Sequence, residues 1–306
     1  MGELLAFLSA CCFASSNVTI IRGVRTSGGE NGAFLSILLT ATLGGSIWLA
    51  KCAVKGWPVM QPVSMLWFAF AGILTIFIGR VFSYASIQQL GAMRASAVKR
   101  LTPLFSVMLG VGFLGESLDL PMVVGTLLIL CSFAVLIRQS LVERGAVARV
   151  EGQPKGTLLE RLGGLAFVYG PVSSMAYAIG YVARKQGMVL MPDAAFGTMF
   201  GAITGALVFV AMAPFAASYR ASVKQTFTVF NPWLLMAGSL NSAGQVLYFM
   251  ALSHSTISRV AMISSIEAIL TIFIVAVVSR SMFQVNGPVV LAAILGVAGT
   301  VLIMFQ

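Results

Sequence analysis

Apolar residues form long runs separated by short polar stretches. The runs cover about residues 3–21, 33–50, 65–88, 94–114, 120–137, 162–183, 194–214, 232–252, 258–278 and 287–305. Each is close to the ~20 residues that a helix needs to cross the hydrocarbon core of a bilayer. The pattern predicts an all-α integral membrane protein with ten transmembrane helices.

The two halves of the chain repeat the same pattern. When Tyr84 is superimposed on Tyr248, a constant offset runs without gaps through the next predicted helix and places Pro103 on Glu267. Each half then holds five predicted spans. Because five is odd, the second half must be inverted in the membrane relative to the first, as in many transporters.

A polar segment separates these halves. We therefore divide the chain into a first five-helix repeat at 1–137, a polar linker at 138–161, and a second, inverted five-helix repeat at 162–306. The linker is too short and too polar to form a soluble domain with its own core.

Composition supports the membrane assignment. Of the 306 residues, 58% are hydrophobic and 9% are charged, whereas soluble domains carry roughly 25% charged residues. The net charge of +10 would suggest nucleic acid as the partner of a soluble protein, but the cations cluster at span ends. We expect a multi-pass protein of the cell membrane, with the lipid bilayer and not nucleic acid as its surroundings.

The distribution of Lys and Arg predicts an orientation, because cytoplasmic loops retain positive charge. Loops after odd-numbered spans hold Arg22, Arg25, Arg94, Arg138, Arg144, Arg149, Lys155, Arg161, Arg220, Lys224 and Arg280. Loops after even-numbered spans hold Lys51, Lys55, Arg184, Lys185 and Arg259. This bias places both termini outside the cytoplasm.

The segment from Tyr84 to Glu116, YASIQQLGAMRASAVKRLTPLFSVMLGVGFLGE, resembles the signature of the EamA family in the drug/metabolite transporter superfamily. The resemblance implies ten spans in two repeats, a central cavity between the halves, and secondary transport, often export of amino acids or other small metabolites. It also implies cytoplasmic termini, opposite to the charge distribution. The second repeat departs from the family pattern at Glu267 and Arg280, where it should carry a proline or small apolar residue and an acid.

Four ionisable residues lie inside predicted spans: Arg80, Lys99, Arg100 and Glu267. Each costs roughly 2.5–3.5 kcal/mol at the centre of a transmembrane helix, so these groups must face water, a ligand or one another. Lys99 and Arg100 share one helical stripe with Pro103, and Glu267 occupies the equivalent stripe of the second repeat. Cations should therefore face an acid between the repeats.

Two interpretations of this cluster remain open. Glu267 could form a structural ion pair with Lys99 or Arg100, and Lys99 could extend to the membrane interface. Alternatively, the cations bind a substrate carboxylate or phosphate, and Glu267 receives a substrate ammonium group or a coupling proton.

Polar stripes on otherwise apolar helices add candidates for substrate binding. Asn241, Gln245 and Tyr248 lie on one face of span eight, and Tyr177 belongs to a stripe of span six with Tyr169, Ser173 and Tyr181. Span one adds Ser16, Asn17 and Thr19. Hydrogen bonding between helices explains any single one of these residues, but together they favour a polar interior.

The remaining motifs narrow the function. Gly197, Gly201 and Gly205 have the spacing of close helix packing, within the chain or in a homodimer. No nucleotide-binding, metal-binding or hydrolase motif occurs, so we expect no catalytic residues, cofactor or metal, and no enzyme.

We therefore expect a secondary active transporter for a small polar metabolite, either amino-acid-like or an organic anion. It would act as an exporter or exchanger by alternating access. Transport would be coupled to protons or to exchange of a second substrate. The alternatives are a membrane-embedded enzyme acting on a lipid-linked substrate and a channel.

Overall fold

The computed structural model describes residues 1–28, 31–90, 101–117, 119–150, 165–278 and 287–304, and within them it is all-α, without a strand. The helices of the first half are α1 (Gly2–Thr26), α2 (Ala33–Lys55), α3 (Pro62–Gly72), the π-helix η1 (Ile73–Gly79), α4 (Arg80–Leu90), α6 (Leu101–Leu114) and α7 (Leu120–Val150). The second half contains α9 (Leu165–Leu190), α10 (Ala194–Met212), α11 (Ala217–Thr228), α12 (Pro232–His254), α13 (Ile257–Ser264), α14 (Glu267–Val278) and α15 (Gly287–Met304).

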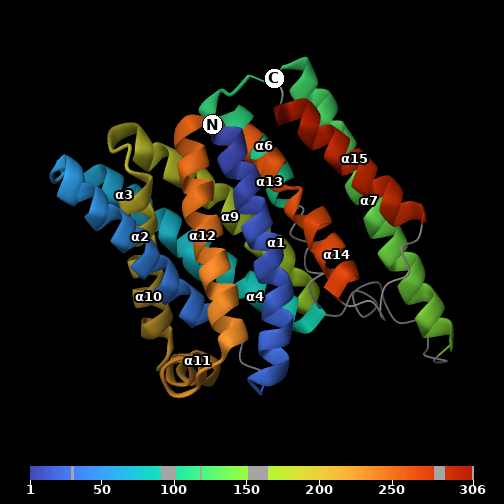
Figure 1. Cartoon of the computed structure of the whole chain (residues 1–306), viewed down its shortest axis with the longest axis horizontal. Coiled ribbons are helices and arrows are strands. Elements are labelled where there is room, and N and C mark those ends of the chain that lie inside the picture. The colour runs from blue at the N-terminus through green and yellow to red at the C-terminus, as the bar shows by residue number, and fades with distance from the viewer. Residues whose placement is uncertain (29–30, 91–100, 118, 151–164, 279–286, 305–306) are drawn as a thin grey trace.

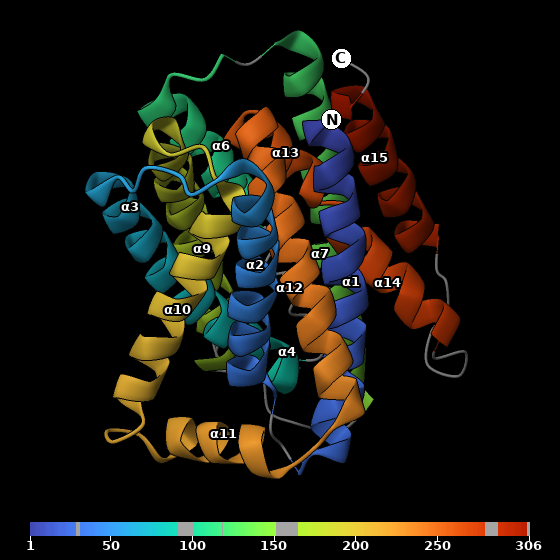
Figure 2. The ribbon, with the colours of Figure 1, turned by 60° about the vertical axis from the view of Figure 1, so that its left-hand side comes forward.

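Most helices run lengthwise in a bundle, with α1 beginning and α15 ending at the same end (Figure 1). We call this the terminal end. At the opposite end, α11 lies across the bundle axis (Figure 2). Hydropathy predicts a loop for this segment, because a polar 12-residue helix is too short and too polar to be a membrane span. We call this second end the α11 end.

Several helices are long and apolar enough to cross a membrane. Within the described residues, five segments meet both requirements: Gly2–Thr26, Ala33–Lys55, Pro62–Gln88, Ala194–Met212 and Ile257–Val275. Two shorter apolar helices cover Leu101–Leu114 and Leu120–Ser132. These segments indicate a multi-pass membrane protein.

The third predicted span contains a π-helical turn. The span runs through α3, η1 and α4, and the backbone N–H of Arg80 bonds to the carbonyl of Thr75 five residues earlier. Such turns are rare in proteins, and those that occur are often found at functional sites. The residues around this turn are therefore the first place to look for a site.

The ninth predicted span is interrupted. Its helix stops at Ser264 and restarts as α14 at Glu267. The prediction that Glu267 lies in a helix interior is wrong, because Glu267 lies in the first turn of α14. A carboxylate is favourable there, because the N-terminus of a helix carries a partial positive charge.

Small residues let α3 and α10 approach closely. A Cβ atom added to Gly72 would lie 2.2 Å from the carbonyl oxygen of Gly201, and one added to Gly205 would lie 2.9 Å from Ile76. The glycine stripe of α10 therefore packs within the chain, and its faces against α3 and η1 are not available to a second copy.

The last helix of the first half is longer than predicted. Helix α7 continues to Val150 and so includes the first part of the predicted linker, while residues 151–164 lie outside the described residues. In the structure, α7 packs along α15 at one side of the bundle (Figure 1).

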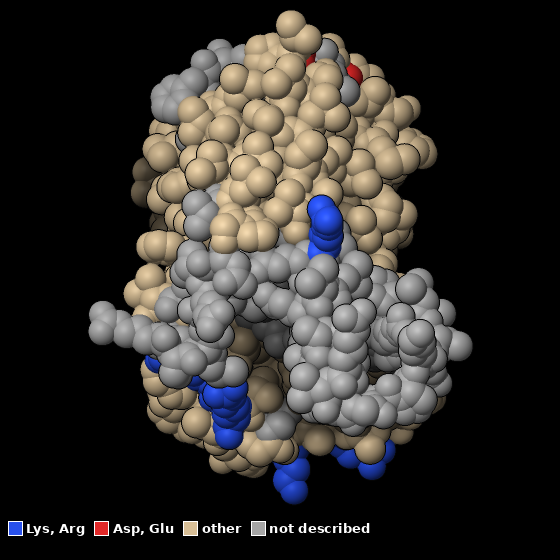
Figure 3. All heavy atoms as spheres, turned by 90° about the vertical axis from the view of Figure 1, so that its right-hand side faces the viewer, with Lys and Arg blue, Asp and Glu red and all other residues tan. Residues whose placement is uncertain are grey.

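The two ends differ in charge. Lys and Arg side chains gather toward the α11 end on the face drawn in Figure 3. Arg25 ends α1 at this end, and α11 adds Arg220 and Lys224. The terminal end carries acids as well as cations, including Glu116 and Asp193, which join helices as described below.

Candidate functional site

Arg80 is the most deeply buried cation in the described part of the bundle. Its side chain is 0% exposed. The guanidinium donates through Nη1 to the carbonyl oxygen of Ser36 at 2.8 Å and to Oγ1 of Thr40 at 2.7 Å. A longer contact of 3.3 Å reaches Oγ of Ser36. Helix α2 therefore anchors one nitrogen of this side chain.

The other edge of the Arg80 guanidinium is not used by α2. Within the described residues, Nε and Nη2 are buried and make no hydrogen bond. These two nitrogens lie side by side on one edge of the guanidinium, where their hydrogens form the fork that fits both oxygens of a carboxylate or phosphate. A buried charged group that uses only part of its hydrogen-bonding capacity is costly in a membrane interior, so Arg80 is a candidate functional residue.

Arg184 is a second buried cation, contrary to its predicted place in a loop. The charge distribution assigned Arg184 to a loop, but α9 continues to Leu190 and the side chain of Arg184 is 2% exposed. Its Nη2 donates to Oγ1 of Thr75 in η1 at 2.6 Å. In the amide orientation that pairs donors with acceptors, the oxygen of Gln245 accepts from both Nη1 and Nη2.

Aromatic rings surround both arginines. The phenols of Tyr84 and Tyr177 lie close to the Arg80 guanidinium. The Arg184 guanidinium lies over the ring of Phe249, 4.7 Å from its centroid. Tyr181 and Tyr248 stack with their centroids 4.3 Å apart. Rings supply apolar surface and a negative face toward the cations, so this wall suits charged ligands with an apolar body.

The structure brings several predicted residues together around Ser36. Asn241 donates through Nδ2 to Oγ of Ser36 at 3.1 Å, so it shares this hydroxyl with Arg80. Tyr177 and Tyr248 are buried in the same aromatic group, and Gln245 binds Arg184. The polar stripes of the sixth and eighth predicted spans therefore face one another across the bundle.

Glu267 lies in a separate contact. Its Oε1 accepts from Nδ2 of Asn17 at 2.7 Å, and Thr271 bonds to its backbone carbonyl at 2.7 Å. Lys99 and Arg100 lie outside the described residues, so their pairing with Glu267 stays a prediction. Asn17 holds the Glu267 carboxylate at the break between α13 and α14.

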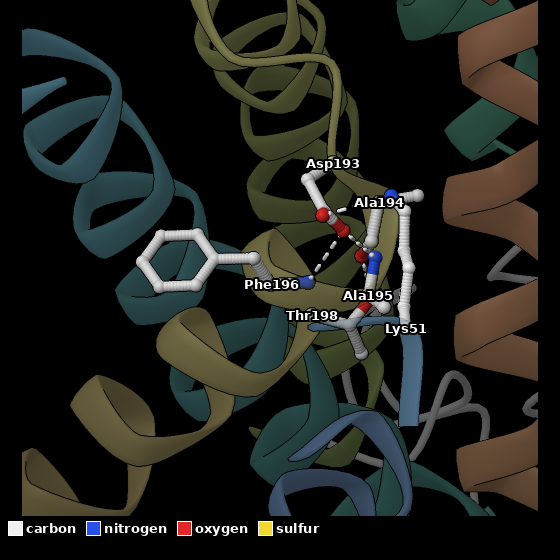
Figure 4. Close-up of polar contacts among 6 residues, drawn as sticks. All are labelled: Lys51, Asp193, Ala194, Ala195, Phe196 and Thr198. Carbon is white, nitrogen blue, oxygen red and sulfur yellow. Dashed lines mark hydrogen bonds and ion pairs between the residues drawn. The ribbon is translucent and has the colours of Figure 1, made fainter. Parts of the chain in front are cut away.

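Polar contacts join the two halves at the terminal end. Lys51 of α2 pairs with Asp193 at 2.8 Å, and the other carboxylate oxygen of Asp193 accepts from the N–H groups of Ala195 and Phe196, which caps α10 (Figure 4). Glu116 caps α13 in a similar way: it accepts from the N–H groups of Ile257 and Ser258 at 2.8 and 3.0 Å.

Some residues of the site carry little signal in the sequence. Ser36, Thr40 and Thr75 are hydroxyl residues in apolar helices, where they commonly bond to their own backbone. Only contact with a buried arginine distinguishes them from other hydroxyl residues: Ser36 and Thr40 contact Arg80, and Thr75 contacts Arg184. The signal for Arg184 was its position within a stripe that also contains Tyr177 and Tyr181, three and four residues apart.

Comparison with known proteins agrees with this architecture. A solved structure titled "Crystal structure of protein" superimposes with a TM-score of 0.67 at 18% sequence identity and covers 98% of this chain and 97% of that one. This similarity concerns the fold alone, and it extends over both halves. No curated protein matches the sequence.

The family assignment rests on the first half of the chain. Residues 1–138 match the family model of the EamA-like transporter family. This segment contains Arg80 together with Ser36 and Thr40, which anchor its guanidinium. Residues 1–138 of the 306-residue chain are therefore similar to the EamA-like transporter family in the drug/metabolite transporter superfamily, a family of membrane transporters.

Proposed function

We propose that this protein is a secondary active transporter, in the cell membrane, for a small metabolite that carries a carboxylate or phosphate. The observation that carries the proposal is the free Nε and Nη2 edge of the buried Arg80. A substrate anion on this edge would supply the two acceptors that the guanidinium lacks. It would also neutralise a charge that is costly inside a membrane.

The helix contacts support two inverted five-helix repeats. If α1 corresponds to α9 and α3–α4 to α12, the packing of α1 against α12 is matched by that of α9 against α3 and α4. The proposed counterparts α2 and α10 pack against each other, as do α7 and α15. A two-fold axis in the membrane plane produces this pattern of matched and self-paired contacts.

Burial of the site supports alternating access. Because Arg80 is fully buried, a substrate reaches its free edge only when the helices around it separate. The contacts of Lys51 with Asp193 and of Glu116 with α13 hold the halves together at the terminal end. We infer that these contacts break when the protein opens toward that end, and that the α11 end opens in the other state.

The substrate class follows from the charges. Arg80 would bind the anionic group, and Glu267, held by Asn17 at the break before α14, would receive an ammonium group or a coupling proton. An amino acid or a similar zwitterion satisfies both residues, and an organic anion satisfies Arg80 with a proton on Glu267. Export or exchange is the direction that we expect from the family.

A ligand screen and a flux assay test this proposal. Thermal unfolding of the purified protein is measured with amino acids, organic acids and phosphate esters. A ligand at 100 times its dissociation constant stabilises the folded protein by about 2.7 kcal/mol. The best ligand then enters proteoliposomes with or without unlabelled ligand inside. Uptake that saturates and accelerates with internal ligand is expected of a carrier. Uptake that is indifferent to internal ligand indicates a channel, and chemical conversion of the ligand indicates an enzyme.

A further inference from the structure

The π-helical turn η1 is held from one side by α9. Oγ1 of Thr75 accepts from Nη2 of Arg184 at 2.6 Å, and the hydroxyl of Ser173 donates to the carbonyl of Gly79 at 2.7 Å. The backbone of α9 also comes very close, because a Cβ atom added to Gly180 would lie 2.3 Å from Cγ2 of Thr75. Three residues on one face of α9, Ser173, Gly180 and Arg184, therefore contact η1.

The π-helical turn determines where Arg80 points. A π-turn contains one more residue than an α-helical turn, and each residue of a regular helix rotates the chain by about 100°. Reversion of η1 to an α-helix would rotate Arg80 by about that angle relative to α3. The guanidinium would then leave Ser36 and Thr40, which hold its Nη1.

Of the contacts between α9 and η1, the one made by Arg184 should oppose reversion of η1 to an α-helix most strongly. Its guanidinium is charged and buried, it binds Thr75 on one side, and the amide oxygen of Gln245 in α12 holds it on the other. Hydrogen bonds from a charged group are stronger than those between neutral groups. With these partners and the Phe249 ring, Arg184 needs no substrate to satisfy it.

We propose that Arg184 is a positioning residue: through Thr75 it keeps η1 in the π-helical form and thereby directs the free edge of Arg80 toward the substrate anion. This role of Arg184 rests on the proposed function in one respect, namely that Arg80 binds the substrate anion. The control of η1 by Arg184 is a property of the protein without ligand.

Hydrogen exchange measures that control directly, on the full-length protein without ligand. In Arg184→Gln, and in Thr75→Val, which keeps the side-chain shape, the amides of residues 73–80 should exchange about tenfold faster, while those of α15 do not change. Arg184→Lys should recover part of the protection. The control is Thr198→Val, because the hydroxyl of Thr198 bonds to Ala194 in its own helix. Unchanged exchange at 73–80 in both Arg184→Gln and Thr75→Val would overturn the inference.

Binding of benzoate, with benzamide as its uncharged analogue, tests the consequence for the site. Arg184→Gln and Thr75→Val should each weaken benzoate binding about tenfold, and the double variant should be no weaker than either one, because both act through the same contact. Additive losses would contradict a shared path through η1. If Arg80→Gln leaves benzoate binding intact, the proposed function is wrong, and the exchange of residues 73–80 still decides the role of Arg184.

Discussion

Nη1 of Arg80 lies 2.7 Å from Oγ1 of Thr40, and this bond ties the cation of α4 to α2. The bond occupies the end of the guanidinium that points away from Nε, so the fork of Nε and Nη2 stays free. An arginine bound the other way round would present a single nitrogen. The contact with Thr40 therefore leaves open the fork of Arg80 that we propose binds a two-oxygen anion.

Loss of this anchor should weaken substrate binding without unfolding the protein. Thr40→Val keeps the shape of the side chain but removes the acceptor, so we expect the dissociation constant of the best anionic ligand to rise about tenfold. Ligand-dependent thermal shifts measure the change. Thr42→Val is the matched control, because Thr42 is exposed on the same helix and bonds to Leu39. Equal ligand affinity in the Thr40 and Thr42 variants would contradict the role of the anchor.

Removal of the charge at Glu267 should separate coupling from binding. Glu267→Gln can still accept from Asn17 but no longer takes up a proton. We expect it to exchange substrate across proteoliposome membranes at a normal rate, but not to accumulate substrate in response to a pH difference. Glu3→Gln, at the terminal end, is the control. If the wild type itself ignores the pH difference, Glu267 has no proton role and serves as a counter-ion.

The charge asymmetry predicts the orientation of the bundle. Arg220 and Lys224 lie on α11, so the α11 end should face the cytoplasm. Cysteines introduced at Ser218 of α11 and Ser253 near the end of α12, both exposed, report on the two ends in a background without native cysteines. In intact cells, an impermeant thiol reagent should label position 253 and spare position 218. The reverse pattern would place both termini in the cytoplasm.

Much of this architecture is readable from the sequence. The second predicted span, 33–50, corresponds to α2 at Ala33–Lys55, and the seventh, 194–214, to α10 at Ala194–Met212. Long apolar runs identify such helices because the bilayer excludes polar residues over a fixed thickness. Arg80, Asn241 and Gln245 were likewise found by their polarity within apolar runs.

Other features depend on packing and leave no mark in the sequence. Hydropathy ends a span before two adjacent cations, yet α9 continues past Arg184 and Lys185. Neighbouring residues on a helix point about 100° apart, so Arg184 binds Thr75 while Lys185 reaches the carbonyls of Leu252 and Ser255. The apolar sequence of η1 does not predict a π-helix either. The contacts that accompany the π-helical form are with residues of α9, which are distant in the sequence.

Asp193 has two roles that substitution can separate. It caps α10 and pairs with Lys51, whose side chain is 40% exposed. Asp193→Ala should lower the free energy of unfolding by about 1–2 kcal/mol through loss of the cap. Lys51→Ala should cost less than about 1 kcal/mol, because a partly exposed ion pair contributes little. Thermal unfolding in detergent compares them, with Asp193→Asn as the variant that keeps a cap. Equal losses for Asp193→Ala and Lys51→Ala would show that the ion pair dominates.

Counterflow in proteoliposomes by wild type, Arg80→Gln and Arg80→Lys tests the central claim most directly. The labelled substrate is the best carboxylate or phosphate ligand of the wild type, and its uncharged amide or alcohol analogue serves as competitor. We predict saturable counterflow in the wild type that the uncharged analogue does not inhibit. Arg80→Gln should have none, and Arg80→Lys should have weaker counterflow, because lysine keeps the charge but not the fork. Counterflow of normal affinity in a correctly folded Arg80→Gln variant would contradict the account.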